Sequence, residues 1–343
     1  MEIFNFAVNN STFVNFYTEI KIGKSPFGVC HTDRILVLGS CFADHIGRRL
    51  SENKFSCVVN PFGTLYNPFS ILSAMKMMAQ GKVFTPFDLF QSQGLWHSWA
   101  HHGSFSSTSV EESLKMMNDA IEQARGQLRK LDVLIITYGT AWVYRLAQEP
   151  EVVVANCHKE PEKRFLRSME RVDALAACMR QTLAVARAIR PQLKVIFTVS
   201  PIRHLRDGLH ANQLSKSALL LAVDEVVADD NRLNHYFPSY EIMMDELRDY
   251  RFYDDDMVHP SSKAVEYIWE RFSSTYFSQQ TLGLMKDWKS IALGLAHRPL
   301  HADSDAYRQF LESLLEKITN IKKQHPYLDV EKELKLCNTR LEI

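Results

Sequence analysis

Three continuous apolar runs mark the chain at wide intervals. They cover residues 35–38, 133–137 and 194–199, and small or polar residues follow each run. Longer patterns of helical period separate the runs, the clearest over 170–189, where apolar side chains gather near one face. Parallel strands covered on both faces read as continuous apolar runs, and strands alternating with such helices form crossover units. The pattern therefore predicts an α/β fold with a mostly parallel sheet.

Weaker patterns complete the expected elements. They indicate strands at 57–59 and 240–244, and helices at 42–50, 110–131, 214–227 and 261–272. A polar and aromatic stretch over 66–108 is interpreted as an insertion after the second strand. From residue 282 the chain becomes helical and charged, with breaks at Pro299 and Pro326. We therefore expect one α/β domain over residues 1–280 and a helical extension over 281–343.

The unusual residues follow the strands. They are Gly39-Ser40-Cys41, Asn60-Pro61-Phe62-Gly63, Gly139-Thr140, and the segment from Ser200 to His204. In an open parallel sheet, ligands bind at the edge where the strands have their carboxyl ends. The sequence therefore predicts that these four turns meet at one site.

Composition and charge narrow the function classes. The chain has 343 residues, 46% of them hydrophobic, with 40 basic and 40 acidic residues. This balance is typical of a globular protein and argues against nucleic acid as the main partner. We find no signal peptide and no apolar stretch of membrane-spanning length, and expect a cytoplasmic protein. The six cysteines form no CxxC pair, so we expect reduced thiols, no zinc site and no cofactor.

A base and its orienting group lie near the end of the predicted domain. Asp256 precedes His259 by three residues on a loop before a helix. This spacing lets the carboxylate hold one imidazole nitrogen while the other faces a nucleophile. Asp254 and Asp255 are alternatives for the orienting role. A solvated acidic loop with a surface histidine is the non-catalytic interpretation.

These motifs resemble those of the GSCFA family, which looks like a branch of the SGNH (GDSL-like) hydrolases. The resemblance covers roughly residues 30–275. It is carried by Gly39-Ser40-Cys41-Phe42-Ala43, by the stretch from Asn60 to Pro68 and by Ser200-Pro201-Ile202-Arg203-His204. It implies a flavodoxin-like three-layer α/β/α sandwich and hydrolysis or transfer of an acyl group.

The SGNH turn reads Gly-Asp-Ser, and aligning its glycine with Gly39 puts Cys41 at the nucleophile position. A cysteine that opens a helix is expected to have a lowered pKa, because the dipole and free amides favour the thiolate. Ser40 is the alternative nucleophile if the turn is shifted by one residue. A buried structural cysteine is the third interpretation.

The resemblance also implies an oxyanion hole formed by the amides of Cys41 and Gly63. The third SGNH donor, an asparagine in Gly-x-Asn, is missing from Gly139-Thr140-Ala141, and the Thr140 hydroxyl is the candidate substitute. Losing such a donor costs about 2.7–4 kcal/mol of transition-state stabilisation. Candidate substrate-binding residues are Asn60, Gly139, Arg203, His204, His101 and His102. The polar residues of 213–217 are interpreted as helix caps.

Together these features predict an SGNH-like hydrolase or acyltransferase. Its substrate would be an ester or thioester, such as an acylated glycan or a small polar metabolite. The alternative is a binding module of the same fold that recognises such a ligand without turnover, which the missing asparagine favours. A scaffold working through the C-terminal helices is the weakest hypothesis.

Overall fold

The computed structural model describes residues 17–342, and its centre is a five-stranded parallel sheet. The sheet has the spatial order β10–β9–β5–β1–β2. The strands are β1 (Arg34–Gly39), β2 (Ser56–Val59), β5 (Val133–Tyr138), β9 (Lys194–Val199) and β10 (Asn234–Tyr236). In chain order this is the flavodoxin-like arrangement, whose switch point lies between the first and third strands.

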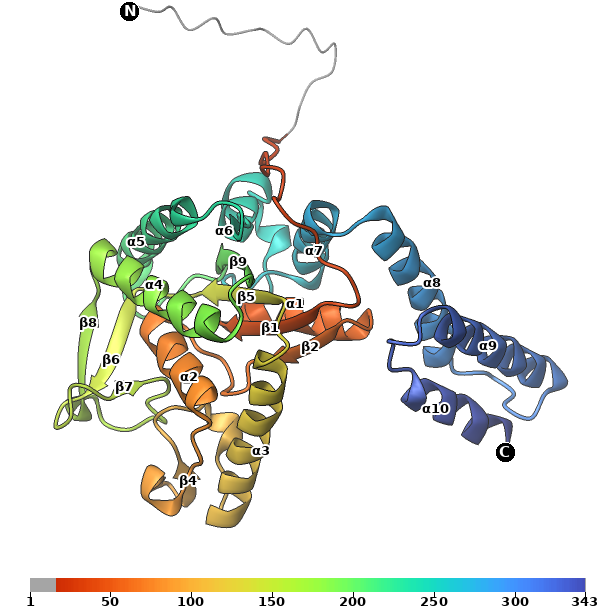
Figure 1. Ribbon diagram of the computed structural model, residues 1–343, viewed down its shortest axis with the longest axis horizontal. Helices are drawn as coiled ribbons and strands as arrows, with labels where there is room; N and C mark the ends of the chain where they lie inside the picture. The colour runs from red at the N-terminus through yellow and green to blue at the C-terminus, as the bar shows by residue number, and fades with distance from the viewer. Residues whose placement is uncertain (1–16, 343) are drawn as a thin grey trace, which may run out of the picture.

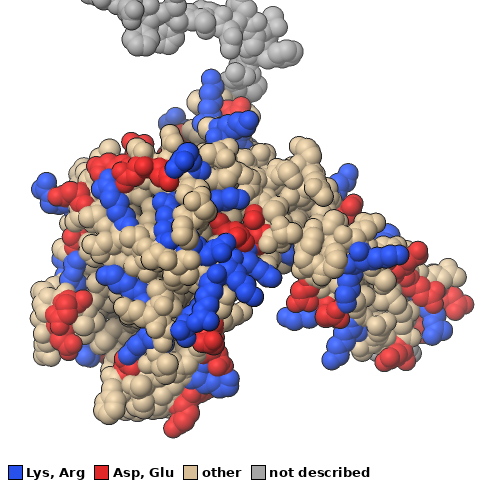
Figure 2. Space-filling view, viewed as in Figure 1, with Lys and Arg blue, Asp and Glu red and all other residues tan. Residues whose placement is uncertain are grey.

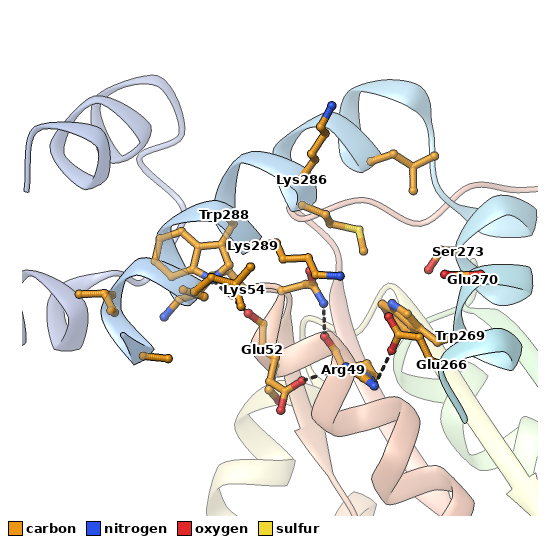
Figure 3. A pocket seen from close by; sticks show the side chains of 18 of the residues that line it. Arg49, Glu52, Lys54, Glu266, Trp269, Glu270, Ser273, Lys286, Trp288 and Lys289 are labelled. Carbon is orange, nitrogen blue, oxygen red and sulfur yellow. Dashed lines mark hydrogen bonds and ion pairs between the residues drawn. The ribbon is translucent and has the colours of Figure 1, made fainter. Parts of the chain in front are cut away.

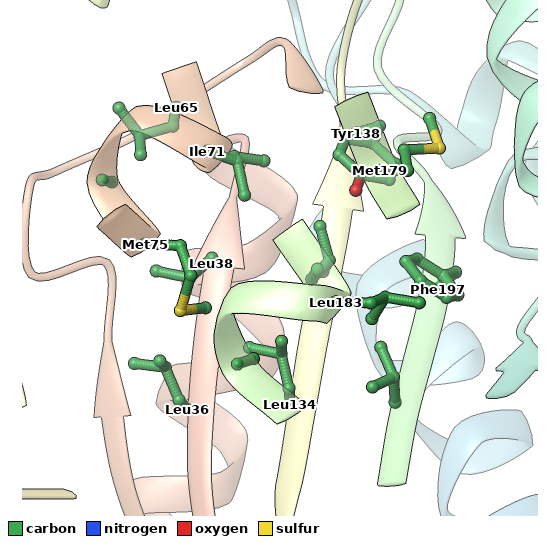
Figure 4. Packing of buried hydrophobic residues seen from close by; sticks show 14 of the residues in the cluster. Leu36, Leu38, Leu65, Ile71, Met75, Leu134, Tyr138, Met179, Leu183 and Phe197 are labelled. Carbon is green, nitrogen blue, oxygen red and sulfur yellow. The ribbon is translucent and has the colours of Figure 1, made fainter. Parts of the chain in front are cut away.

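Helices cover both faces of the sheet (Figure 1). One face carries α1 (Cys41–Glu52) and α7 (Ser262–Tyr276), and the other carries α2 (Pro68–Gln80), α3 (Val110–Leu128), α4 (Val172–Ile189) and α5 (Gly208–Asp229). Strand β1 shows why both faces must be covered. Leu36 and Leu38 enter the core under α2 and α4 (Figure 4), whereas Ile35 and Val37 enter the opposite core. The predicted α/β/α sandwich is thereby confirmed.

Two small antiparallel units lie outside the central sheet. Strands β6 (Trp142–Leu146), β7 (Val153–Val154) and β8 (Phe165–Met169) form a sheet of order β7–β6–β8, and β3 (Phe90–Ser92) pairs with β4 (Leu95–His97). Sequence analysis predicted neither unit. The three-stranded sheet follows β5 directly, so it stands beside the carboxyl edge of the central sheet.

The structure corrects two predicted elements. The proposed last strand at 240–244 is wrong: α6 (Ser239–Glu241) and a π-helical turn (Ile242–Glu246) occupy this segment, and the last strand is the short, polar β10. The turn packs Ile242 and Met243 into the core, and this burial accounts for the apolar pattern that resembled a strand. The insertion at 66–108 is also shorter than predicted. Its first part is α2, whose Ile71 and Met75 are fully buried against the sheet.

Three further helices follow α7: α8 (Gln279–Ala296), α9 (Asp305–Gln324) and α10 (Glu331–Leu341). They extend to one side of the α/β domain (Figure 1) and share an apolar core of their own, which includes Trp288 and Ile318. Acidic and basic side chains are interspersed over the face shown in Figure 2, with basic ones gathered near its middle. No helix within residues 17–342 is both long and apolar enough to cross a membrane.

A cavity of about 910 Å³ lies where α8 and α10 meet α1 and α7 (Figure 3). Its charged groups are largely paired: Arg49 with Glu266, and Lys54 with Glu333. The Trp288 indole donates a hydrogen bond to the carbonyl of Glu52, which joins α8 to the end of α1. Neither histidine nor cysteine lines this cavity. None of the candidate site residues selected from the sequence lines it.

Candidate active site

The turn after β1 depends on a glycine. Gly39 has a φ of +141°, and a Cβ there would lie 2.2 Å from the carbonyl oxygen of Thr137 on β5. A side chain at this position would separate the two central strands. With glycine present, the Ser40 amide donates to that same carbonyl at 3.1 Å, and α1 begins at Cys41. The sequence thus carries the chain directly from a buried strand to the first turn of a helix.

Asn60 fixes this turn from the end of β2. Its Oδ1 accepts a hydrogen bond from the Gly39 amide at 2.8 Å, and its Nδ2 donates to Asp44 of α1 at 2.6 Å. The side chain is 7% exposed and does not line the cavity beside Cys41. Asn60 therefore holds the β1–α1 turn in place, whereas sequence analysis placed it among the candidate substrate-binding residues.

The turn brings Cys41 beside the predicted base. The Sγ atom of Cys41 lies 4.0 Å from Nε2 of His259, 218 positions away in the sequence. On the other side of the ring, Nδ1 lies 2.5 Å from Oδ2 of Asp256. A thiol, an imidazole and a carboxylate therefore stand in line, in the arrangement of a nucleophile, a general base and its orienting group.

The loop before α7 preorganises the carboxylate. Oδ1 of Asp256 accepts hydrogen bonds from the backbone amides of Val258 and His259, both at 2.9 Å. These amides, together with the His259 side chain, lower the pKa of Asp256 to about 2. The group is therefore a carboxylate over the whole physiological range. Asp254 accepts from the amide of Asp255, and neither side chain is hydrogen-bonded to the imidazole.

The Cys41 thiol does not have the lowered pKa that its place in the helix predicted. Burial raises the pKa above its usual value, and the charge of Asp44 adds to this effect. The amides of Cys41 and Phe42 and the Lys216 ammonium favour the thiolate, but they do not overcome burial. The resting group is therefore a thiol, and removal of its proton requires a base.

Cys41, Asp256 and His259 line a cavity of about 600 Å³. Of the other candidates, Thr140, Arg203 and His204 also line it. These side chains come from turns after three strands and from the loop before α7. Three of the four predicted turns therefore meet at this cavity, whereas the Asn60–Gly63 turn contributes no lining residue. Ser40 is 1% exposed and lies outside the cavity wall.

The candidate oxyanion donors other than Cys41 already have partners. The Gly63 amide donates to the carbonyl of Asn60 at 2.7 Å, and the amides of Gly139 and Thr140 both donate to the carbonyl of Tyr66, at 2.7 and 2.9 Å. The Thr140 hydroxyl lies 3.1 Å from Ser215 Oγ and accepts from the Trp142 amide. These groups hold the turns together in this structure.

The two candidate histidines of the segment after α2 lie outside the cavity lining. His101 is fully buried, with its ring stacked on Phe62 at 4.7 Å, and burial lowers its pKa to about 3. The amide of His102 donates to the carbonyl of Phe62. Both residues therefore pack the segment onto the Asn60–Gly63 turn. Among the described residues, no three histidine, cysteine or acidic side chains are grouped to hold a metal ion.

Much of the cavity wall comes from residues that sequence analysis did not select. The sheet β6–β7–β8 and the loops beside it contribute Trp142, Tyr144, Val154, Asn156, Cys157 and Arg167. The aromatic and β-branched residues of Trp-Val-Tyr in β6 are a strand signal that could have identified this sheet. Arg167 lies over the Trp142 ring at 3.9 Å and pairs with Asp207.

Helix α5 supplies a second unexpected feature. It begins at Gly208, so Ser215 and Lys216 lie inside the helix and are not caps as predicted. Ser215 Oγ accepts from the Ala141 amide at 2.7 Å, which holds the turn after β5. Lys216 is fully buried, and its Nζ donates to the carbonyl of Ser200 at 2.7 Å. Burial lowers the pKa of this lysine to about 7.

Two family models match the α/β domain and the C-terminal helices separately. The model of the GSCFA family matches residues 34–272, and that of the GSCFA domain protein C-terminal domain matches 288–343. No curated protein matches the sequence. Among solved structures, the crystal structure of a carbohydrate esterase family 3 from Talaromyces cellulolyticus is similar, with 13% identity and a TM-score of 0.36. That match covers 75% of this chain and 99% of the esterase.

The match to the first family model spans the sheet, the Gly39-Ser40-Cys41 turn and the loop of Asp256 and His259. The protein described here is therefore a member of the GSCFA family, as its turn motifs indicated.

Proposed function

We propose that the protein is an acyl hydrolase or acyltransferase that works through Cys41, His259 and Asp256. The observation that carries this proposal is the line of three groups at the cavity: Sγ to Nε2 at 4.0 Å and Nδ1 to Oδ2 at 2.5 Å. The 4.0 Å distance is longer than a strong hydrogen bond, as apo catalytic pairs often are before substrate binds.

The reaction follows from these positions. Nε2 of His259 takes the thiol proton while Sγ of Cys41 attacks the acyl carbon, and the carbonyl electron pair moves onto oxygen. The tetrahedral intermediate collapses to a thioester on Cys41, and His259 gives the proton to the leaving alcohol or thiol. Water, activated by the same imidazole, then releases the acid, or an acceptor alcohol takes the acyl group. Asp256 holds the imidazole and stabilises its charged form.

Because the pKa of the Cys41 thiol is raised, His259 must remove the thiol proton. Because burial keeps the thiol protonated, nucleophile and base act together and not as a preformed ion pair. The amides that begin α1 lie next to the sulfur and are the first candidate donors to the oxyanion. Nucleophilic attack therefore depends on the presence of His259.

The cavity wall favours a polar substrate that carries an anionic group. Arg167 pairs with Asp207 and Arg206 with Glu162, whereas Arg203 forms no ion pair with an acidic side chain within residues 17–342. The Arg203 guanidinium contacts Met244 Sδ at 3.3 Å, and it lines the same cavity as Cys41. It is therefore suited to hold a carboxylate or phosphate on the substrate. An ester or thioester of a small acidic metabolite or of a charged glycan fits this wall.

A second function, ligand binding without turnover, is favoured by a different observation. The amides of Gly63, Gly139 and Thr140 are all used by backbone carbonyls. A site lacking those donors would stabilise an oxyanion poorly and would recognise an acylated ligand without cleaving it.

Acyl trapping distinguishes the two functions. The protein is treated with p-nitrophenyl acetate, and the site of acetylation is mapped by mass spectrometry in wild type, Cys41→Ala, Ser40→Ala and His259→Ala. Acetyl on Cys41 that is lost in His259→Ala supports the proposal. Acetyl on Ser40 would make the enzyme a serine hydrolase of the same class. No adduct at either residue in folded protein would favour the binding module.

A further inference from the structure

The oxyanion hole lacks a donor opposite the helix amides. The SGNH-type asparagine is replaced at Ala141, a fully buried residue, and the Thr140 hydroxyl is already bound to Ser215 and the Trp142 amide. One side of a developing oxyanion would be served by the amides of α1. The question is which group in the cavity serves the other side.

His204 reaches the cavity from the loop after β9. Gly39 of β1 pairs with Thr137 of β5, so the turns that carry Cys41 and Gly139 follow the carboxyl ends of neighbouring strands. The next strand, β9, pairs Val199 with Tyr138 and leads to His204, which lines the cavity with Cys41 and His259. Nε2 of His204 lies over Gly139, 3.4 Å from where a Cβ on that glycine would be. The absence of a side chain at Gly139 keeps this space open.

A backbone hydrogen bond and a ring contact position His204, and its ring nitrogens take part in neither. The backbone amide of His204 donates to Oδ1 of Asn212 at 2.9 Å, and the ring meets Tyr66 edge to face at 5.6 Å. Neither ring nitrogen forms a hydrogen bond with any group in residues 17–342. Burial, together with the charge of Lys216, lowers the pKa of His204 to about 4. At neutral pH the residue is therefore an uncharged imidazole with one free N–H donor.

We propose that His204 donates its Nε2–H to the oxyanion formed when Cys41 attacks the substrate, in the role that an asparagine side chain fills in SGNH hydrolases. This inference rests on the proposed acyl transfer. The carbonyl π pair moves onto oxygen as the C–S bond forms, the oxygen accepts from Nε2–H, and the pair returns when the leaving group departs. His204 neither gains nor loses a proton, so His259 performs all proton transfer.

The test compares two reactions of the same thiol. Acetylation by p-nitrophenyl acetate passes through an oxyanion, whereas alkylation by iodoacetamide forms none. Both rates are measured at pH 7.5 in wild type, His204→Leu, which removes the donor, and His204→Gln, whose amide nitrogen reaches a similar position. His210→Leu makes the same chemical change at an exposed residue of α5 and serves as the matched control.

We expect His204→Leu to slow the saturating acetylation rate by about 10²–10³-fold, the effect of removing one oxyanion donor. Its half-saturating ester concentration and its alkylation rate should stay close to wild type, and His204→Gln should recover most of the acetylation rate. Unchanged acetylation in His204→Leu would overturn the inference while leaving the proposed function intact. An equal loss of acetylation and alkylation would also overturn it, because His204 would then act on the thiol or on its packing. If wild-type Cys41 is alkylated but never acetylated, the proposed function and this inference fail together.

Discussion

The buried amine of Lys216 should make stability depend on pH between about pH 7 and 10. The side chain is fully buried below the turn after β9, its one hydrogen bond goes to the Ser200 carbonyl, and the Tyr240 ring lies 5.7 Å away. No acidic side chain pairs with it among the described residues. Burial, the dominant effect, and the charge of Arg203 lower its pKa to about 7, while Cys41 opposes this.

The sign follows from proton binding. In the unfolded chain the lysine has a pKa near 10.4, so between pH 7 and about 10 the unfolded state binds more protons than the folded state. Stability therefore rises with pH through this window, and the full destabilising effect is present below pH 7. For a folded pKa of about 7, the free energy of unfolding should gain about 2 kcal/mol between pH 6 and 8.5 from this group alone.

Lys216→Met isolates the contribution, because methionine keeps most of the stem and cannot be charged. Urea denaturation of wild type and variant at several pH values from 6 to 8.5 gives the difference in the free energy of unfolding as a function of pH. Loss of the hydrogen bond to Ser200 lowers the free energy of unfolding by a similar amount at every pH. The comparison is therefore between the slopes of the two plots of unfolding free energy against pH. Lys130→Met, at an exposed lysine, controls for the general effect of removing a charge. Parallel pH curves for wild type and Lys216→Met would refute the reasoning.

Further predictions concern the triad and two glycines. Asp256→Asn should retain the fold but lower the acetylation rate by roughly 10²–10⁴-fold, because the imidazole loses its orienting carboxylate; acetylation kinetics at pH 7.5 measure this, and a near-wild-type rate would contradict the triad. Gly63→Ala should destabilise the protein by about 1–3 kcal/mol, since φ is +75° and the new Cβ would lie 2.3 Å from the Cβ of His102. Gly283→Ala, in open space on α8, should instead stabilise by about 0.5–1 kcal/mol. Urea denaturation checks both glycine variants, and equal effects would refute the steric argument.

The local features of the site could be predicted because they depend on neighbours in the sequence. Asp256 and His259 are three residues apart, and the loop between them supplies the amides that hold the carboxylate. Cys41 opens a helix because a glycine ends the strand before it. The meeting of distant turns was also predictable, since parallel strands place all their carboxyl ends at one edge.

The hydrophobic pattern failed to identify strands in two segments where burial does not follow the pattern expected of a strand. The apolar residues of segment 240–244 are buried in the core by a π-helical turn, not by a strand. The actual last strand, Asn234-His235-Tyr236, is short and polar. The sheet β6–β7–β8 was missed for a related reason. Its strands are half exposed and carry arginine and serine among their apolar residues, so they lack the long apolar runs by which the central strands were recognised.

By itself, the sequence determined the sandwich and the family, and it indicated the group of Cys41, Asp256 and His259, because hydrophobic period, strand direction and local spacing decide these. Only the tertiary structure decided the protonation state of the Cys41 thiol, the occupied state of the expected oxyanion amides and the approach of His204 to Gly139. The physical reason is the same in each case. Desolvation and the choice of hydrogen-bond partners depend on groups far away in the chain, such as Ser215, which holds the Ala141 amide 74 positions before it.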